Sequence, residues 1–373
     1  TLSGESVAPS KAMQLDGIGR SGERPGHDEG ERVAPFAELL EHEHLRGDAQ
    51  RFFEALGRHF EARDDAPEQR HARRGARVVG NGQDGRARAV LGDEKLSFLG
   101  ASYGTRLGAI YAETFPRNVR ALVLDGAIDP TLGTTARRVA LFAGFQHAFE
   151  NMAAYCAQSP TCPLGEDAQQ ATAAFQQIVR PLIDHPITTP DGRQVTYTAV
   201  VDGVTTGLYG EVGWRAVILA LTELKAGGGK TLLFLRDILS QRSADGSYGN
   251  GNESLLAINC LDEERHTSEQ ETTMTRDIFR VAPFIDTGRS VNARDLCEHW
   301  PVQPTVGYPY ARNIKGLPRT LVVSVTRDPA TPHEGGISLA KSLGASLLTV
   351  EGEQHGVALI AGNACVNDIV GDY

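Results

Sequence analysis

The stretch Lys95–Gly108, which reads KLSFLGASYGTRLG, decides the fold of this chain. Its first part, 96–101, is a short apolar run that predicts a buried strand, and 103–115 has a helix-compatible composition without proline. Between them, the letters GASYG around Ser102 match the G-x-S-x-G nucleophile elbow, a sharp turn that holds a serine hydroxyl above the edge of a sheet. A Cβ at either flanking glycine is expected to collide with the neighbouring strand or helix. Strand, turn and helix together favour a catalytic serine at Ser102 over a chance match in a chain with 41 glycines.

The composition of the 373-residue chain limits its class. A hydrophobic fraction of 40% and a charged fraction of 23% are typical of a globular protein, and the length allows one large α/β domain or two ordinary ones. The net charge of −10 argues against nucleic acid as a partner, because no basic excess is present to replace phosphate counterions. The sequence contains no run of about 18 apolar residues, so no membrane-spanning segment is predicted. The first residues show neither an initiator Met nor the apolar core of a signal peptide.

Neither a metal nor a cofactor is expected. The chain contains no Cys-x-x-Cys pair, so a zinc ribbon is not predicted. The letters GGGKT at 227–231 resemble part of a phosphate loop. A complete phosphate loop would have a glycine at position 224, where this chain has Leu224, and would follow a strand. Both features are absent from the sequence pattern, so a turn between two helices is predicted.

The cysteines favour disulfides over free buried thiols. The chain contains five of them: Cys156, Cys162, Cys260, Cys297 and Cys365. The first two flank the short segment AQSPT, which suits a local disulfide in a proline-containing loop. The odd number leaves one cysteine without a partner inside the chain.

The chain divides into three kinds of sequence. Residues 1–88 are highly charged, rich in arginine and histidine and poor in apolar runs; a polar helix or two is predicted over 35–60 and disorder over 61–88. Residues 89–130 and 301–373 carry the apolar strands of an α/β core. Residues 131–300 read mostly as helices and are expected, by analogy with other α/β enzymes, to form a cap over the site.

The expected elements of the core and the cap follow from hydrophobic periodicity. Strands are predicted at 96–101, 120–125, 320–325 and 345–350, a strand-like piece at 194–201, and helices at 103–115, 136–157, 167–183, 214–225, 231–240 and 336–343. The strand, helix and strand from 96 to 125 predict a parallel βαβ unit.

Three residues follow the Ser, Asp, His order that an elbow serine requires. Ser102, Asp328 and His355 each come just after a predicted strand, and such loops meet at one edge of a parallel sheet. Ser102 would attack an acyl carbon, His355 would carry the proton, and Asp328 would hold the imidazole tautomer. Asp125 also follows a strand and is the rival acid. The amide of Tyr103 is the predicted oxyanion donor, and residues 1–90 contain no Gly-Gly pair to supply a second one.

These residues resemble a known family. The stretches LSFLGASYGTRLGAIYAETFPRNVRALVLDGAIDP, LPRTLVVSVTRDPATP and GEQHG are similar to the tripeptidyl-aminopeptidase branch of the proline-iminopeptidase-like α/β hydrolases of actinobacteria. The segments CAQSPTCPLG, DGSYGNGNESLLAINCLDE and CEHWP also look like features of that family. The resemblance covers about Arg88 to Tyr373.

The resemblance implies a mostly parallel α/β-hydrolase fold with a helical cap, in a serine exopeptidase that releases short peptides from a free N-terminus. It also implies export to the cell envelope or beyond. Cysteine pairs Cys156–Cys162 and Cys260–Cys297 would suit that location, with a partner for Cys365 beyond Tyr373. Acidic cap residues that could hold the substrate ammonium are Glu253, Asp262, Glu263 and Glu264.

The N-terminal region departs from the family pattern. Family members carry an early Asn-Pro-Gly-Gly-Pro-Gly loop and an Asp-x-Arg-Gly turn, and neither occurs in residues 1–87, so these residues are hypothesised not to be the family's N-terminal half. Two other functions therefore stay open: a carboxylesterase or lipase that uses the same triad, and a catalytically impaired member without the oxyanion glycine loop. The oligomeric state and the substrate-binding residues are not predicted.

Overall fold

A parallel four-stranded sheet organises the part of the chain that the computed structural model describes, residues 92–373. Its strands are β1 (Leu96–Ala101), β2 (Val119–Asp125), β5 (Thr320–Val325) and β6 (Ser346–Val350), in the spatial order β1-β2-β5-β6. The four strands confirm the prediction of an α/β core with a mostly parallel sheet. The expectations for residues 1–88 lie outside the described residues.

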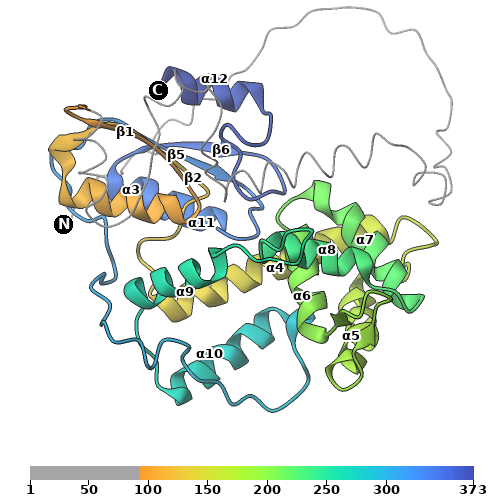
Figure 1. Cartoon of the computed structure of the whole chain (residues 1–373). Helices are drawn as coiled ribbons and strands as arrows, with labels where there is room; N and C mark the ends of the chain where they lie inside the picture. The colour runs from red at the N-terminus through yellow and green to blue at the C-terminus, as the bar shows by residue number, and fades with distance from the viewer. Residues whose placement is uncertain (1–91) are drawn as a thin grey trace, which may run out of the picture. The chain divides into compact units, whose positions relative to one another are not determined.

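Helices lie on both faces of this sheet (Figure 1). Leu122 and Leu124 of β2 pack toward α3 (Tyr103–Thr114) and α11 (His333–Leu343). Val123, between them, belongs to the opposite cluster, which includes α12 (Ala364–Asp372). Because successive strand residues point to opposite faces, the run of apolar residues in β2 fills two cores at once. The helix α12 was not predicted from the sequence.

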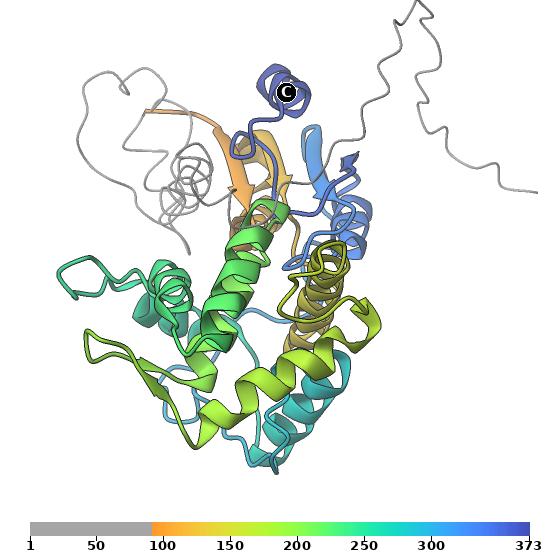
Figure 2. The same ribbon diagram turned by 90° about the vertical axis from the view of Figure 1, so that its right-hand side faces the viewer.

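The residues between β2 and β5 form a mainly helical segment, which we call the helical segment (Figure 2). Its elements are α4 (Thr134–Cys156), α5 (Ala171–Val179), α6 (Tyr197–Gly207), α7 (Glu211–Lys225), α8 (Lys230–Leu239), α9 (Gly251–Asp262) and α10 (Ser268–Val281), with the two-stranded pair β3 (Ile187–Thr188) and β4 (Gln194–Val195). Short 3₁₀ turns complete the segment: η5 (Ala168–Gln170), η6 (Arg180–Ile183) and η7 (Pro283–Ile285); a further one, η4 (Pro116–Asn118), lies between α3 and β2. The fully buried ring of Phe149 lies 5.2 Å from the rings of Phe175 and Phe284, which ties α4 to α5 and η7. As predicted, the letters GGGKT lie at the turn between α7 and α8.

Two expected elements of the helical segment differ from the structure: one is mostly wrong and one is divided. The strand-like piece 194–201 is a strand only at Gln194–Val195, because the Thr196 hydroxyl caps α6 by accepting the amide hydrogen of Ala199 at 3.1 Å. Val200 and Val204, one helical turn apart, are then buried on the same side of α6. The helix expected over 167–183 divides into η5, α5 and η6, with Pro181 in the first turn of η6, where the ring provides no amide hydrogen.

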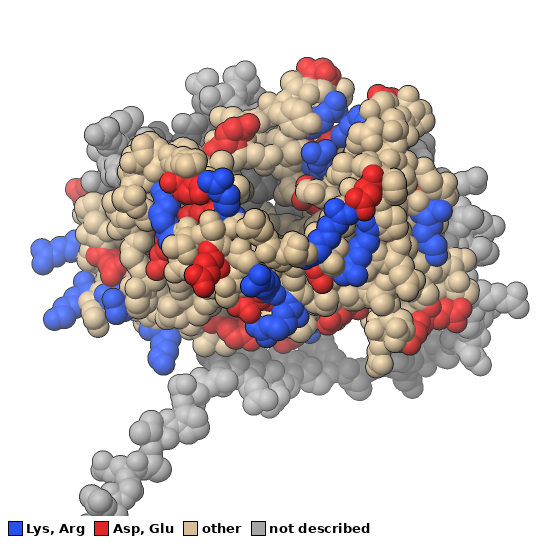
Figure 3. Space-filling view, turned by 90° about the horizontal axis from the view of Figure 1, so that it is seen from below, with Lys and Arg blue, Asp and Glu red and all other residues tan. Residues whose placement is uncertain are grey.

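The surface of the helical segment is mixed in charge. On the side where α10 lies, Figure 3 shows basic and acidic side chains interspersed around a hollow near the middle of the view. Within residues 92–373, every helix is too short or too polar to cross a membrane.

Candidate active site

Ser102 lies on the strained turn that the elbow motif predicts. It follows β1 directly and occupies the N-cap position of α3 with φ 54° and ψ −119°, a conformation that non-glycine residues rarely adopt. The backbone N–H of Ser102 donates to the carbonyl oxygen of Asp125 at 2.9 Å, so the end of β2 holds the turn. A serine at an N-cap ordinarily uses its hydroxyl to cap the helix, but Ser102 makes no such bond. Its hydroxyl is therefore not engaged in capping α3.

The two glycines of the elbow differ in what they allow. A Cβ built on Gly100 would lie 2.5 Å from the carbonyl oxygen of Gly104, so glycine is required where strand and helix meet. The expectation for Gly104 is wrong: a Cβ there meets nothing within 4 Å among the described residues. The close approach on the helix side comes from Gly108, whose Cβ would lie 2.7 Å from a side-chain carbon of Leu124.

His355 and Asp328 are brought together from the loops after β6 and β5. Nδ1 of His355 lies 2.9 and 3.0 Å from the two carboxylate oxygens of Asp328. The amides of Ala330 and Thr331 donate to Oδ1 of Asp328 at 2.9 and 2.8 Å, and the Thr331 hydroxyl donates to Oδ2 at 3.0 Å. Asp328 is thus a buried, fixed acceptor that orients the imidazole through Nδ1 and leaves Nε2 directed elsewhere.

The electrostatics of this pair suit a general base. Burial lowers the pKa of His355, but the Asp328 carboxylate, and to a smaller extent that of Asp125, raise it, and the net pKa lies above the usual value of 6.5. The imidazole is therefore a stronger proton acceptor than a solvent-exposed histidine. The side chain of His355 is 12% exposed and that of Asp328 is fully buried, so this ion pair is little screened by water.

Asp125 and Gly126 connect the serine turn to the neighbourhood of the histidine. A Cβ on Gly126 would lie 3.3 Å from Cε1 of His355, and the preceding Asp125 accepts the amide hydrogen of Ser102. Within residues 92–373 the hydroxyl of Ser102 forms no direct hydrogen bond with His355; such bonds often close only when substrate is bound. Asp125, the rival acid, hydrogen-bonds to backbone amides rather than to the imidazole.

The helical segment contacts the histidine directly, which the sequence did not reveal. The backbone N–H of His355 donates to the carbonyl oxygen of Tyr209 at 2.8 Å, and the two rings meet edge to face at 5.5 Å. An isolated antiparallel bridge between Gly210 and Gln354 adds to this contact. Burial, with a smaller contribution from Asp328, raises the pKa of Tyr209 to about 12, so its hydroxyl stays protonated beside the imidazole.

The amide of Tyr103 lies in the first turn of α3, where backbone N–H groups have no acceptor within the helix. This position supports its predicted role as an oxyanion donor. Residues 1–90, from which a second donor would be expected, lie outside the described part of the chain. The side chain of Tyr103 reaches the helical segment, where its hydroxyl donates to Oδ2 of Asp262. Arg106, also in α3, donates to the carbonyl oxygen of Asp262 at 2.7 Å.

The four acidic residues considered for an ammonium site have different partners in the structure. Glu263 forms ion pairs with two arginines of α4, Arg137 and Arg138. Glu264 accepts the backbone N–H of Thr134, and Glu253 lies in the exposed first turn of α9. Burial, together with the neighbouring Glu263, raises the pKa of Asp262 to about 6.

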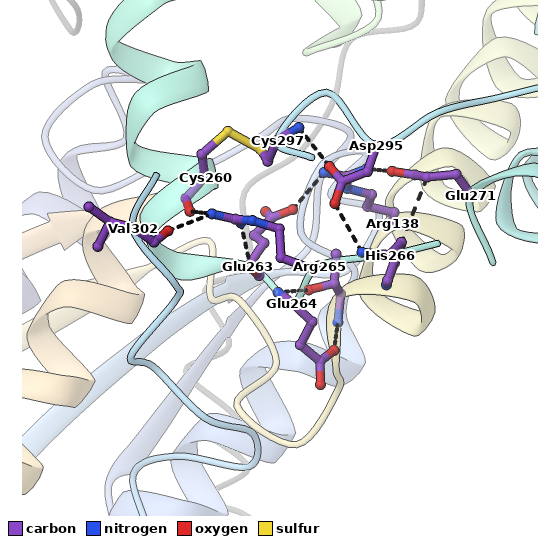
Figure 4. The surroundings of a disulfide bond; sticks show 11 residues. Arg138, Cys260, Glu263, Glu264, Arg265, His266, Glu271, Asp295, Cys297 and Val302 are labelled. Carbon is purple, nitrogen blue, oxygen red and sulfur yellow. Dashed lines mark hydrogen bonds and ion pairs between the residues drawn. A yellow bond between two sulfur atoms is a disulfide. The ribbon is translucent and has the colours of Figure 1, made fainter. Parts of the chain in front are cut away.

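The two disulfides have the pairing that the family resemblance implied. Cys156–Cys162 closes a turn at the end of α4, and Cys260–Cys297 joins the end of α9 to the loop that precedes β5. Figure 4 shows the second disulfide beside Glu263, Glu264 and Arg265, the residues that follow Asp262. It therefore anchors the acidic end of α9. Cys365 is exposed and forms no disulfide within the described residues. In the same part of the chain, no group of three potential ligands could hold a metal ion.

Together, the parallel sheet, the serine elbow at the end of β1 and the Asp–His pair beyond β5 and β6 define an α/β hydrolase. Residues 282–373 match a family model described as TAP-like protein. The chain is 40% identical over 296 residues to serine protease Hip1 of Mycobacterium tuberculosis, covering 77% of this chain and 56% of that protein. It is 40% identical over 265 residues to carboxylesterase B of the same species, covering 70% and 51%. It is 28% identical over 297 residues to tripeptidyl aminopeptidase of Streptomyces lividans, covering 77% and 53%.

These matches support the resemblance to the TAP-like α/β hydrolases that the sequence motifs indicate. The chain spans about half the length of the curated relatives that it matches.

Proposed function

We propose that this protein is a serine hydrolase that releases short peptides from the N-terminus of polypeptides through an acyl-enzyme. The observation that carries the proposal is the His355–Asp328 pair, held at 2.9 Å on the sheet edge where the strained turn presents Ser102. Ser102 attacks the scissile carbonyl, and His355 takes its proton and then passes it to the leaving amine. Asp328 stabilises the imidazolium, and the Tyr103 amide stabilises the tetrahedral oxyanion.

In this proposal the helical segment is a cap that limits access to the serine. It meets the histidine loop at Tyr209 and the elbow helix at Asp262, so it borders the reacting groups on two sides. The two disulfides support a protein exported to the cell envelope or beyond.

The free N-terminus of the substrate is proposed to bind the carboxylate of Asp262. This carboxylate is fixed by the Tyr103 hydroxyl, one residue from the nucleophile, so a bound ammonium group would lie only a short peptide away from Ser102. Of the acidic residues considered, Asp262 contacts the elbow helix, and its carboxylate forms no ion pair with an arginine within the described residues; Arg106 bonds only to its backbone carbonyl oxygen.

The first experiment asks whether the serine is reactive. A fluorophosphonate probe should label the wild-type protein and not Ser102→Ala, whereas Ser268→Ala, at an exposed helix start, should be labelled like wild type. Absence of labelling in the wild type would support an impaired member of the family. Equal labelling of wild type and Ser102→Ala would assign the nucleophile elsewhere.

The second experiment separates peptide from ester chemistry. A carboxylesterase on the same triad is the other candidate, supported by the 40% identity to a protein named carboxylesterase B. A tripeptide amide with a free amino group should be turned over faster than its N-acetylated form, and Asp262→Asn should remove most of that difference. The matched control is Glu253→Gln, an exposed acid in the same helix. Hydrolysis of a short-chain aryl ester without any peptide turnover would favour the esterase.

A further inference from the structure

Asp125 occupies a position between the two halves of the site. It is the last residue of β2, and its side chain is fully buried. Its backbone carbonyl accepts the amide hydrogen of Ser102 at 2.9 Å. Its carboxylate reaches the opposite loop, where Oδ2 accepts the amide hydrogens of Val357 and Ala358, each at 2.7 Å. One residue thus joins the serine turn to the residues that follow His355.

The contacts of this carboxylate are uneven, and the unevenness is informative. Oδ2 accepts two short backbone hydrogen bonds, whereas Oδ1 is buried and has no hydrogen-bond partner among the described residues. A buried, half-satisfied carboxylate is a costly way to fix a loop for stability alone, since one neutral oxygen would accept both amides. Its negative charge therefore requires a separate reason.

The charged neighbours of Asp125 supply that reason. The titratable groups that face it are His355 and Asp328, and Tyr209 faces the imidazole from the helical segment. Burial raises the pKa of Asp125, the two amides and His355 lower it, and Asp328 raises it. In return, the negative charge on Asp125 raises the pKa of His355, in addition to the larger effect of Asp328.

The local backbone leaves little room for another arrangement. Gly356 has φ 70°, and a Cβ there would lie 3.3 Å from Oδ2 of Asp125. A Cβ on Gly126 would lie 3.1 Å from the Thr331 hydroxyl oxygen and 3.4 Å from Oδ2 of Asp328. Glycines on both sides thus let Asp125 and the histidine loop approach closely.

We propose that Asp125 is a positioning residue of the hydrolase: it ties the loop of His355 to the turn of Ser102 and adds a second negative charge for the imidazolium. It does so without touching substrate or the transferred proton. The proposal rests on the proposed triad, and it predicts that geometry and charge can be separated. In Asp125→Asn, the amide oxygen can take the place of Oδ2 and the NH₂ group that of the unpartnered Oδ1. Asp125→Ala removes both.

The test measures fluorophosphonate labelling and the kcat and KM of an aryl ester for wild type, both variants and Asp129→Asn. The control residue is the acid of a nearby turn, where it bonds only to Thr131 within the described residues. We expect Asp125→Ala to lower kcat about 100-fold with little change in KM, because small misplacements of reacting groups have effects of this size. Asp125→Asn should stay within about tenfold of wild type, with the acid limb of its pH profile at lower pH. Equal losses in both variants, or wild-type kcat in Asp125→Ala, would overturn the proposal.

A second readout does not depend on turnover. NMR of histidine-labelled protein, with His355 assigned by comparison with His355→Gln, gives the pKa and the tautomer of the imidazole. Asp125→Asn should lower that pKa while the Nδ1 proton toward Asp328 is kept. This result is expected even if the fluorophosphonate probe does not react with the protein. An unchanged pKa would refute the proposed role of the charge. If the fluorophosphonate does not react with the wild type but the pKa of His355 falls in Asp125→Asn as predicted, the result would count against the proposed function and not against the role of Asp125.

Discussion

Replacing Gly100 with alanine should destabilise the elbow, whereas the same change at Gly104 should not. A Cβ on Gly100 would lie 2.5 Å from the carbonyl oxygen and 2.6 Å from the carbonyl carbon of Gly104, with the buried ring of Phe98 also in contact. Ordinary contacts of a Cβ begin near 3.4 Å, so the first turn of α3 would have to move by nearly an ångström. Backbone groups cannot rotate away as a side chain can.

The free-energy change follows from opposing effects. Overpacking of this kind costs about 1–3 kcal/mol, and contacts with backbone belong at the upper end of that range. Alanine also reduces the freedom of the unfolded chain, which contributes about 0.4–1 kcal/mol in the other direction. We therefore expect Gly100→Ala to lose about 2 kcal/mol. Gly104 is a helix residue whose Cβ would meet nothing within 4 Å of the described chain, so Gly104→Ala should be neutral or gain up to about 1 kcal/mol.

Urea unfolding of the three proteins measures this difference, and the rate of fluorophosphonate labelling reports on the serine turn. Gly100→Ala should be both less stable and more slowly labelled, while Gly104→Ala should match wild type in both. The reasoning fails if Gly100→Ala unfolds within about 0.5 kcal/mol of wild type, or if Gly104→Ala loses as much as Gly100→Ala.

Three further outcomes are expected. Activity requires a neutral imidazole and therefore rises with pH through the pKa of His355. Because that pKa is raised, the acid limb of kcat/KM should have its midpoint above pH 6.5. A midpoint at or below that pH would contradict the assignment of His355. Asp328→Asn should lower kcat about 10⁴-fold by favouring the wrong tautomer, which single-turnover labelling would show as an equally slow reaction of Ser102. The disulfide Cys260–Cys297 closes 37 residues and should contribute about 3.8 kcal/mol in a chain-entropy model, against about 2.2 kcal/mol for the disulfide that closes 6 residues. Unfolding of the two double Cys→Ala variants gives both values, and the reverse order would exclude loop entropy as the main cause.

Local signals in the sequence were sufficient for the core. The runs 96–101 and 320–325 are apolar, of strand length and followed by turn residues, so they are strands in any parallel α/β arrangement. The capping box of α10, in which the side chains of Thr267 and Gln270 each accept a backbone N–H of the other residue, is also a local signal, carried by the letters T-x-x-Q. At Tyr197, by contrast, local β propensity pointed to a strand and packing against α8 decided for a helix.

Contacts between distant segments were not accessible in the same way. Tyr209 and His355 are separated by 146 residues, and nothing near either position indicates that a backbone hydrogen bond joins them. The Tyr103–Asp262 contact is equally remote, 159 residues apart. This contact distinguishes Asp262 from the other three acidic candidates. The four have the same charge in the sequence but different partners in the fold.

The sequence by itself determined the candidate nucleophile, the candidate histidine and the order in which the acid would occur, because the elbow and the ends of strands are local patterns. It left two aspartates after buried strands, Asp125 and Asp328, as candidates for the acid. Only the tertiary structure directed Asp328 to Nδ1 of His355 and Asp125 to the amides beyond it. The physical reason is that a parallel sheet brings all strand ends to one edge. Which side chains meet there depends on the lateral order β1-β2-β5-β6 and on the loop paths, which long-range packing sets.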